Sequence, residues 1–294
     1  MSSLPEDYRK CLRALKEKAS TYEEFKNRNP DREEGTCQWV LSHTQYREWH
    51  DKEHHGLLWI SADPGCGKSV LVRSLVDHEL QTTDQHTVCY FSFKDNDEQN
   101  NVATALCALL HQLFSKQRRL FQHAIRAWDT NGEKLVQERG ELWRILMAAG
   151  TDDEAQDVTY VLDALDECQP SDRQWLINML SKFHQDSLSL PSSRRGRLKI
   201  LVTSRPYDDI RVDFQKQIKD LPTIRLRGEE ENERVHEEID MVIRIRVGEL
   251  KSDLGLDSDT AAQLQTTLLE MEHRTYLWLY LAIEGIKDTY RRSH

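Results

Sequence analysis

One stretch decides the fold of this chain: Trp59-Ile60-Ser61-Ala62-Asp63-Pro64-Gly65-Cys66-Gly67-Lys68-Ser69. The apolar segment that leads into it, residues 56–60, predicts a buried strand. The segment that follows has apolar residues at helical spacing and predicts a helix with one buried side: Leu71, Val72, Leu75, Val76 and Leu80. A strand, a glycine-rich turn and a helix in this order are the context of a phosphate-binding loop.

The chemistry of this turn suits a phosphate group. Unpaired N–H groups at the start of a helix, together with the helix dipole, attract phosphate oxygens. Gly65 and Gly67 let the main chain approach the ligand without a Cβ atom. Lys68 can reach the β- and γ-phosphates, and the Ser69 hydroxyl can bind Mg²⁺. We therefore expect the nucleotide to contact eight consecutive residues: Asp63, Pro64, Gly65, Cys66, Gly67, Lys68, Ser69 and Val70.

One position departs from the usual pattern G-x-x-x-x-G-K-[ST]. Ala62 stands where the first glycine is expected, and the loop stays usable as long as the φ angle of Ala62 is negative. The alternative interpretation is a glycine-rich turn with a chance lysine. The strand, the helix and a second, acidic motif together favour the phosphate loop.

The acidic motif follows another apolar strand, residues 158–162, and reads Asp163-Ala164-Leu165-Asp166-Glu167. Asp163 is placed to hold Mg²⁺, through water, while Asp166 or Glu167 can orient or deprotonate an attacking water. Three carboxylates this close repel one another without a cation, which favours a bound metal. The alternative is a strand-to-helix turn with solvated acids.

The remaining strands predict the fold class. Apolar segments that alternate with amphipathic helices indicate further strands at residues 87–93, 198–202 and 223–226. This alternation predicts a five-stranded parallel sheet with helices on both faces and a ligand at the carboxyl ends of the strands. Arg205 follows the fourth strand, within Thr203-Ser204-Arg205-Pro206, so it can sense or stabilise the γ-phosphate. A salt bridge between Arg205 and the acids is the alternative.

Composition limits the possible partners and compartments. The net charge of −10 argues against a general binder of nucleic acid or anionic membranes. No apolar run approaches the ~20 residues of a membrane-spanning helix, and no secretory signal is present at the N-terminus. The six cysteines form no C-x-x-C pair, which predicts reduced thiols in a cytoplasmic protein. Cys66 is the exception among these buried thiols, because a helix N-terminus lowers a thiol pKa and so permits a redox role. The favoured account is that Cys66 fills a variable position of the loop.

The chain divides into three predicted parts. Residues 1–50 form a helical leader, with one helix over residues 6–18 and a second that Thr36 caps and that extends through Trp49. Residues 51–228 form the nucleotide-binding domain, and residues 229–294 form a small all-helical domain. Since the leader immediately precedes the phosphate loop, part of it is expected to pack against the nucleotide base. A helical brace on the sheet is the alternative for any of its residues.

The motifs together resemble the NACHT modules of STAND-class P-loop NTPases, in particular those of fungal NOD-like receptors of the heterokaryon-incompatibility type. Five stretches carry the resemblance: Gly35-Thr36-Cys37-Gln38-Trp39, Gly56-Leu57-Leu58-Trp59-Ile60, Asp163-Ala164-Leu165-Asp166-Glu167, Thr203-Ser204-Arg205-Pro206 and Thr275-Tyr276-Leu277-Trp278. The resemblance implies Lys68 and Ser69 as phosphate and Mg²⁺ ligands and Asp163 as support for the metal. It implies Asp166 and Glu167 as the hydrolytic acids and Arg205 as the phosphate sensor.

The resemblance also implies a function: a signalling switch that binds Mg²⁺ with ATP or GTP, hydrolyses it slowly to ADP or GDP, and controls self-association. Effector and repeat domains are expected outside this chain. The helical-domain stretch 273–276 lacks the proline that touches the base in related ATPases, and no N-K-x-D element for guanine is present, so ATP is weakly favoured. A scaffold module that binds nucleotide without hydrolysis is the alternative function. A kinase-like phosphotransferase is a weaker alternative, because nothing in the sequence resembles an arginine-bearing lid or a second-substrate pocket.

Overall fold

The computed structural model describes residues 6–19, 22–24, 31–189, 197–206, 210, 221–226, 229–272 and 274–293, with only the backbone of 229–235 and 293. Its centre is a parallel sheet in the order β2-β3-β4-β1-β5. The strands are β1 (Gly56–Ala62), β2 (His86–Ser92), β3 (Asp157–Asp163), β4 (Leu198–Ser204) and β5 (Thr223–Leu226). The register places Ser92 of β2 opposite Asp163 of β3, and Ser61 of β1 opposite Ser204 of β4. The ends of these strands therefore meet at one edge, as the predicted fold class requires.

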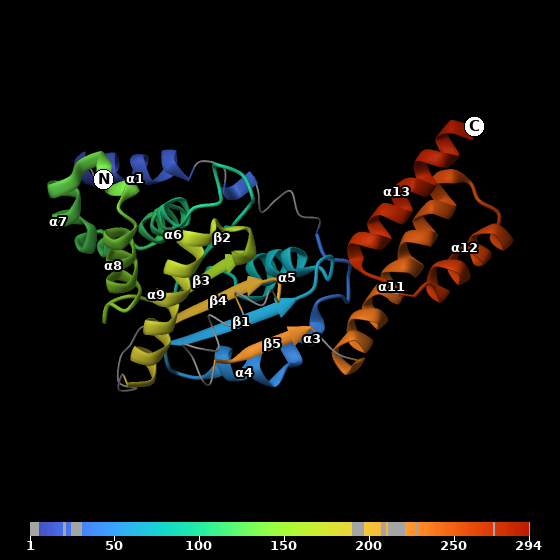
Figure 1. Cartoon of the computed structure of the whole chain (residues 1–294), viewed down its shortest axis with the longest axis horizontal. Helices are drawn as coiled ribbons and strands as arrows, with labels where there is room; N and C mark the ends of the chain where they lie inside the picture. Colours follow the sequence, from blue (N-terminus) through green and yellow to red (C-terminus); the bar gives the residue numbers. More distant parts are fainter. Residues whose placement is uncertain are drawn as a thin grey trace.

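Alternating side chains of the buried strands build two cores. Leu57 and Trp59 of β1 join the larger core, whereas Leu58 and Ile60 join the core on the opposite face. The larger core packs under α1 (Glu6–Lys18), α6 (Val102–Lys116), α7 (Gln122–Asn131), α8 (Arg139–Gly150) and α9 (Pro170–Ser189). The opposite face is covered by α3 (Gln38–Ser42), α4 (Thr44–Asp51) and α5 (Lys68–Ser74), which continues as the π-helix Leu75–Glu79. The predicted sheet with two covered faces is confirmed (Figure 1).

Three helices follow the sheet: α11 (Glu229–Leu254), α12 (Ser258–Glu270) and α13 (Tyr276–Ser293). They pack around a third core that also contains Ala62 of β1 and Leu226 of β5. This bundle of α11–α13 lies beyond the arrowheads of β1 and β5, at the sheet edge where the loops carry the polar motifs (Figure 1). Within the described residues, none of the helices combines the length and apolar composition that crossing a membrane requires.

The leader differs from its prediction. A single helix capped by Thr36 is wrong, because the Thr36 hydroxyl donates to the carbonyl of Glu33 and the chain breaks at His43 into α3 and α4. The His43 ring accepts the N–H of Gln45 and so caps α4. The sequence also predicts a charged linker with turn-forming residues over residues 27–35, which lies partly outside the described residues.

Two further differences concern the middle of the chain. The sequence also predicts a helix over residues 135–147, whereas the structure has a short 3₁₀ segment, Gly132–Gln137, followed by α8. The sequence prediction omits α7, whose buried face includes two alanines, Ala124 and Ala127, and one large residue, Trp128.

Candidate functional site

The phosphate loop connects β1 to α5 through a backbone that only glycine adopts easily. Gly65 and Gly67 have φ angles of +79° and +78°, in the left-handed region where a Cβ atom is strained. Gly67 precedes the first residue of α5, and no side chain caps this helix start. The N–H groups of the first turn of α5 are therefore available to an anion. Ala62 is not among the residues with positive φ, so the alanine fits the position of the missing glycine.

Lys68 lies folded over its own loop. Its Nζ atom donates to the carbonyl oxygen of Ala62 at 2.5 Å and to that of Asp63 at 3.0 Å. Burial lowers the pKa of Lys68, while the nearby charge of Asp166 acts in the opposite direction. An ammonium held by two neutral carbonyls gains Coulombic attraction when it exchanges them for negatively charged phosphate oxygens.

Asp163 ends β3 and is fully buried. Its Oδ1 atom accepts a hydrogen bond of 2.6 Å from the hydroxyl of Thr203 on β4. Its Oδ2 atom is buried and has no hydrogen-bond partner among the described residues. A buried carboxylate oxygen without a partner is costly, so this atom fits a divalent cation or a water that binds one. The donor set of Asp163 and the Ser69 hydroxyl therefore suits Mg²⁺, which prefers oxygen ligands and retains several waters.

Asp166 and Arg205 form a pair across the strand ends. The carboxylate of Asp166, 3% exposed, accepts the Arg205 N–H at 2.9 Å and lies 3.1 Å from the Arg205 Nε atom. This geometry is the salt bridge that the sequence left open as the alternative for Arg205. Both oxygens of Asp166 are engaged, so this carboxylate is less suited than its neighbour to activate water.

Glu167 has a different environment. Its Oε2 atom accepts the N–H of Asp95 at 3.3 Å, and its Oε1 atom lies 3.9 Å from Nζ of Lys94. Burial raises the pKa of Glu167, whereas Lys94 and the Asp95 N–H oppose the rise. A carboxylate with a raised pKa and a quarter of its side chain exposed is the better general base of the two acids.

Across the described residues, no three histidine, cysteine or acidic side chains are placed to hold a metal together. Each of the three acids lies against a separate partner, namely Thr203, Arg205 and Lys94. The cation beside the acidic motif stays a prediction. One expectation about the loop is wrong: burial raises the pKa of the Cys66 thiol, which was expected to be lowered.

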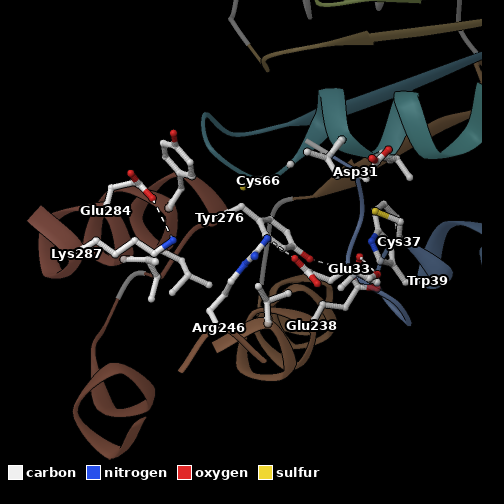
Figure 2. A pocket seen from close by; sticks show the side chains of 18 residues that line it. Asp31, Glu33, Cys37, Trp39, Cys66, Glu238, Arg246, Tyr276, Glu284 and Lys287 are labelled. Atoms are coloured by element: carbon white, nitrogen blue, oxygen red, sulfur yellow. Dashed lines mark hydrogen bonds and ion pairs between the residues drawn. The ribbon is translucent and has the colours of Figure 1, made fainter. Parts of the chain in front are cut away.

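A cavity of about 230 Å³ opens beside the phosphate loop. Figure 2 shows that its walls come from three separate parts of the chain: the leader, the loop with α5, and the bundle. Leader residues Cys37 and Trp39 face Cys66 of the loop and Tyr276 of α13. Arg246 of α11 crosses the cavity and pairs with Glu33 of the leader.

Sequence reasoning missed the bundle side of this cavity. Glu238, Arg246 and Tyr276 are far from the phosphate loop in sequence, and only the docking of α11 and α13 brings them beside it. The stretch Thr275–Trp278 carried part of the family resemblance, but the motif did not indicate which residues of the phosphate loop it would contact. Leader residues also line this cavity, and the expected packing of the leader against the nucleotide base stays a prediction.

Comparisons with known proteins identify relatives. The family described as "Nephrocystin 3, N-terminal" matches residues 35–205, and a second family, described as a domain of unknown function, matches residues 235–294. The vegetative incompatibility protein HET-E-1 of Podospora anserina is 29% identical over 255 residues, which are 85% of this chain. The predicted resemblance to fungal incompatibility proteins is thereby confirmed. The chain spans only 18% of the length of that relative.

Solved structures with a similar arrangement include two replication proteins. The ORC2 protein of Aeropyrum pernix, in ADPNP and ADP complexes, has a TM-score of 0.42 and 13% identity, covering 81% of this chain and 69% of that one. Domain III of the Thermotoga maritima replication initiation protein DnaA has a TM-score of 0.38 and 13% identity, covering 92% of this chain and all of that one.

Proposed function

We propose, from the premise that this chain belongs to the Nephrocystin 3 N-terminal family, that it binds a Mg²⁺–nucleoside triphosphate and hydrolyses it slowly. One observation carries the proposal: the uncapped helix start after Gly67 follows β1, and the buried Oδ2 atom of Asp163 lies at the end of β3, at the same carboxyl end of the sheet, where these two strands flank β4. The first suits a polyanion, and the second suits its divalent cation. Among the described residues, this Oδ2 atom has no hydrogen-bond partner.

Each predicted residue has a defined task in this proposal. The main-chain N–H groups of the loop and Lys68 hold the β- and γ-phosphates. Ser69 and Asp163 hold the cation, whose chemistry is to neutralise charge on the phosphate oxygens. Glu167 accepts a proton from the attacking water, for which its raised pKa is suited. Arg205 fixes Asp166 and senses the γ-phosphate from that position.

The biological role follows from the position of the bundle. Its third core includes Ala62, the residue at which β1 enters the phosphate loop. Exchange of a bound diphosphate for a triphosphate can thus change the position of the bundle relative to the sheet. We propose that this change controls self-association in a receptor with effector and repeat domains. The three parts 1–50, 51–228 and 229–294 act as leader, NTPase domain and helical domain in this scheme. A binding-only scaffold is the second candidate, favoured by the engagement of both Asp166 oxygens.

The test compares nucleotide binding by wild type and Lys68→Ala in isothermal titration calorimetry, with Mg²⁺–ATP and Mg²⁺–GTP measured side by side. Lys251→Ala is the control, since Lys251 is an exposed lysine of the bundle whose Nζ donates to Ser258. We expect wild type and the control to bind one equivalent, with ATP preferred, and Lys68→Ala to lose binding. Equal binding by all three proteins refutes the proposed site.

Phosphate release then separates the two candidate functions. Slow release from wild type at saturating Mg²⁺–nucleotide supports the switch, and binding without any release supports the scaffold. Size-exclusion chromatography with light scattering, with the diphosphate or a non-hydrolysable triphosphate analogue, tests self-association. An identical mass in both nucleotide states contradicts that part of the proposal.

A further inference from the structure

A three-residue segment of the bundle lies against both left-handed glycines of the phosphate loop. A Cβ atom on Gly67 would come within 2.9 Å of the Tyr276 ring, and one on Gly65 within 3.0 Å of Thr275 and of Leu277. The N–H of Leu277 also donates to the carbonyl of Gly65, at 3.3 Å. The loop is thus supported from outside by residues that come more than two hundred positions later in the chain.

Tyr276 is itself held in place. Its hydroxyl donates to Oε2 of Glu238 on α11 at 2.8 Å, as the dashed line in Figure 2 shows. Burial raises the pKa of Tyr276, so the hydroxyl keeps its proton and remains a donor. The ring therefore cannot rotate away from Gly67 without breaking a hydrogen bond to a carboxylate that is only 9% exposed.

Glu238 connects this contact to the leader. Burial raises the pKa of Glu238, whereas the nearby backbone N–H groups of Cys37 and Gln38, at the start of α3, lower it. α3 has no side-chain cap of its own, and Cys37 has a left-handed φ of 64°. Because a carboxylate near a helix N-terminus is favourable, Glu238 of α11 supports the start of α3 electrostatically. One side chain thereby ties together α3, α11 and α13.

This support matters because glycine is the least restrained residue. A loop with two left-handed glycines samples many conformations when it is free, and only some of them expose its N–H groups to a phosphate. A contact that fixes those glycines before the ligand arrives removes an entropic cost from binding. The ammonium of Lys68 bonds instead to the carbonyls of Ala62 and Asp63.

We propose that Tyr276 is a positioning residue of the phosphate loop, which it holds in the binding conformation through its ring on Gly67 and its hydroxyl on Glu238. The inference rests on the proposed function, since it concerns the same nucleotide. It assigns a task to the bundle, most of which belongs to the family of unknown function: the bundle completes the phosphate site. It also makes nucleotide affinity dependent on whether the bundle is docked.

The experiment uses the full chain and two tyrosines of α13. Tyr276→Phe keeps the ring and removes the hydroxyl, whereas Tyr276→Ala removes both. Tyr280→Phe and Tyr280→Ala are the matched controls, because Tyr280 lies one helical turn away, borders the same cavity and is 62% exposed. A fluorescent ATP analogue with Mg²⁺ gives dissociation rates by stopped flow, and phosphate release gives the rate at saturation.

We expect Tyr276→Phe to release the analogue about 3- to 10-fold faster than wild type, since it loses one hydrogen bond to a charged group. Tyr276→Ala is expected to release it about 30- to 100-fold faster. The controls should stay within about twofold of wild type, and the rate of phosphate release at saturation should stay unchanged in Tyr276→Phe. Amide hydrogen exchange of residues 62–69 in the nucleotide-free protein should quicken in both Tyr276 variants and in neither control.

The outcomes separate this inference from the proposed function. Dissociation and exchange rates that match wild type in Tyr276→Phe and Tyr276→Ala overturn the inference, while wild type still binds nucleotide. Equal effects of the Tyr276 and Tyr280 substitutions also overturn it, because they indicate a general effect of the cavity wall. If wild type binds no nucleotide, the proposed function fails, and the hydrogen-exchange comparison still tests whether Tyr276 holds the loop.

Discussion

The pair of Asp166 and Arg205 provides the sharpest prediction, because the structure gives both its geometry and its exposure. Arg205→Ala removes the guanidinium from a carboxylate that is 3% exposed, while the Arg205 N–H remains bonded to Oδ1 of Asp166. Breaking a fully buried ion pair costs about 3–5 kcal/mol. The Arg205 side chain is 37% exposed, so the loss of unfolding free energy should be smaller. We expect about 2 kcal/mol, the contribution of a hydrogen bond to a charged group.

This cost should appear as a fall in the melting temperature of about 4 °C or more, measured by circular dichroism without nucleotide. Arg246→Ala is the control. Arg246 is also 37% exposed, but its partners Glu33 and Glu249 are 22% and 47% exposed. Ion pairs of that kind contribute about 0–1 kcal/mol, so the control should melt within about 2 °C of wild type.

A double-mutant cycle with Asp166→Asn decides the role of Arg205. If the two side chains stabilise each other, the double variant should lose about 1 kcal/mol less than the sum of the single losses. Strict additivity would falsify the pairing. An Arg205→Ala protein that melts like wild type, yet loses phosphate release, would show instead that Arg205 acts on the phosphate alone.

Three further predictions concern other parts of the molecule. Glu167→Gln should bind nucleotide like wild type and release phosphate about 10²- to 10⁴-fold more slowly, whereas unchanged release places the general base elsewhere. Lys199 is buried, which lowers its pKa to about 8 from 10.5, although its Nζ donates to the carbonyls of Trp49 and Lys52. The unfolded chain therefore binds more protons than the folded chain between pH 8 and 10.5. The free energy of unfolding, measured by urea titration, should rise there by up to about 1.4 kcal/mol per pH unit relative to that of Lys199→Met. Parallel curves of unfolding free energy against pH for the two proteins contradict this. Asn101→Ala removes the side chain that accepts the N–H of Thr104 at the start of α6, and should lower the free energy of unfolding by about 1 kcal/mol. The comparison is Asn131→Ala, expected to be milder, because the partly buried Asn131 amide donates only to the carbonyl of Ala127 in its own helix.

The sequence by itself determined the sheet and the order of its functional loops. Strands buried on both faces appear in the sequence as continuous apolar runs, so residues 56–60 and 158–162 were recognisable as strands. Because the strands are parallel, the polar residues that follow them lie at the same end of the sheet. Gly65, Gly67 and Lys68 at the start of the helix were equally predictable, because a phosphate loop is a local structure. The assignment of Leu57 and Leu58 to opposite cores came from the structure.

Tertiary structure alone decided which side chains face one another. The sequence placed the three acids of the 163–167 motif at one strand end, but it did not show that Thr203, Arg205 and Lys94 contact one acid each. The same holds for Thr36, whose hydroxyl donates to the carbonyl of Glu33 and does not cap the following helix. Hydrogen-bond partners depend on packing between distant segments, and no local pattern encodes that packing. The ring of Tyr276 on Gly67 is the clearest case, since two residues more than two hundred positions apart meet only after the bundle has docked.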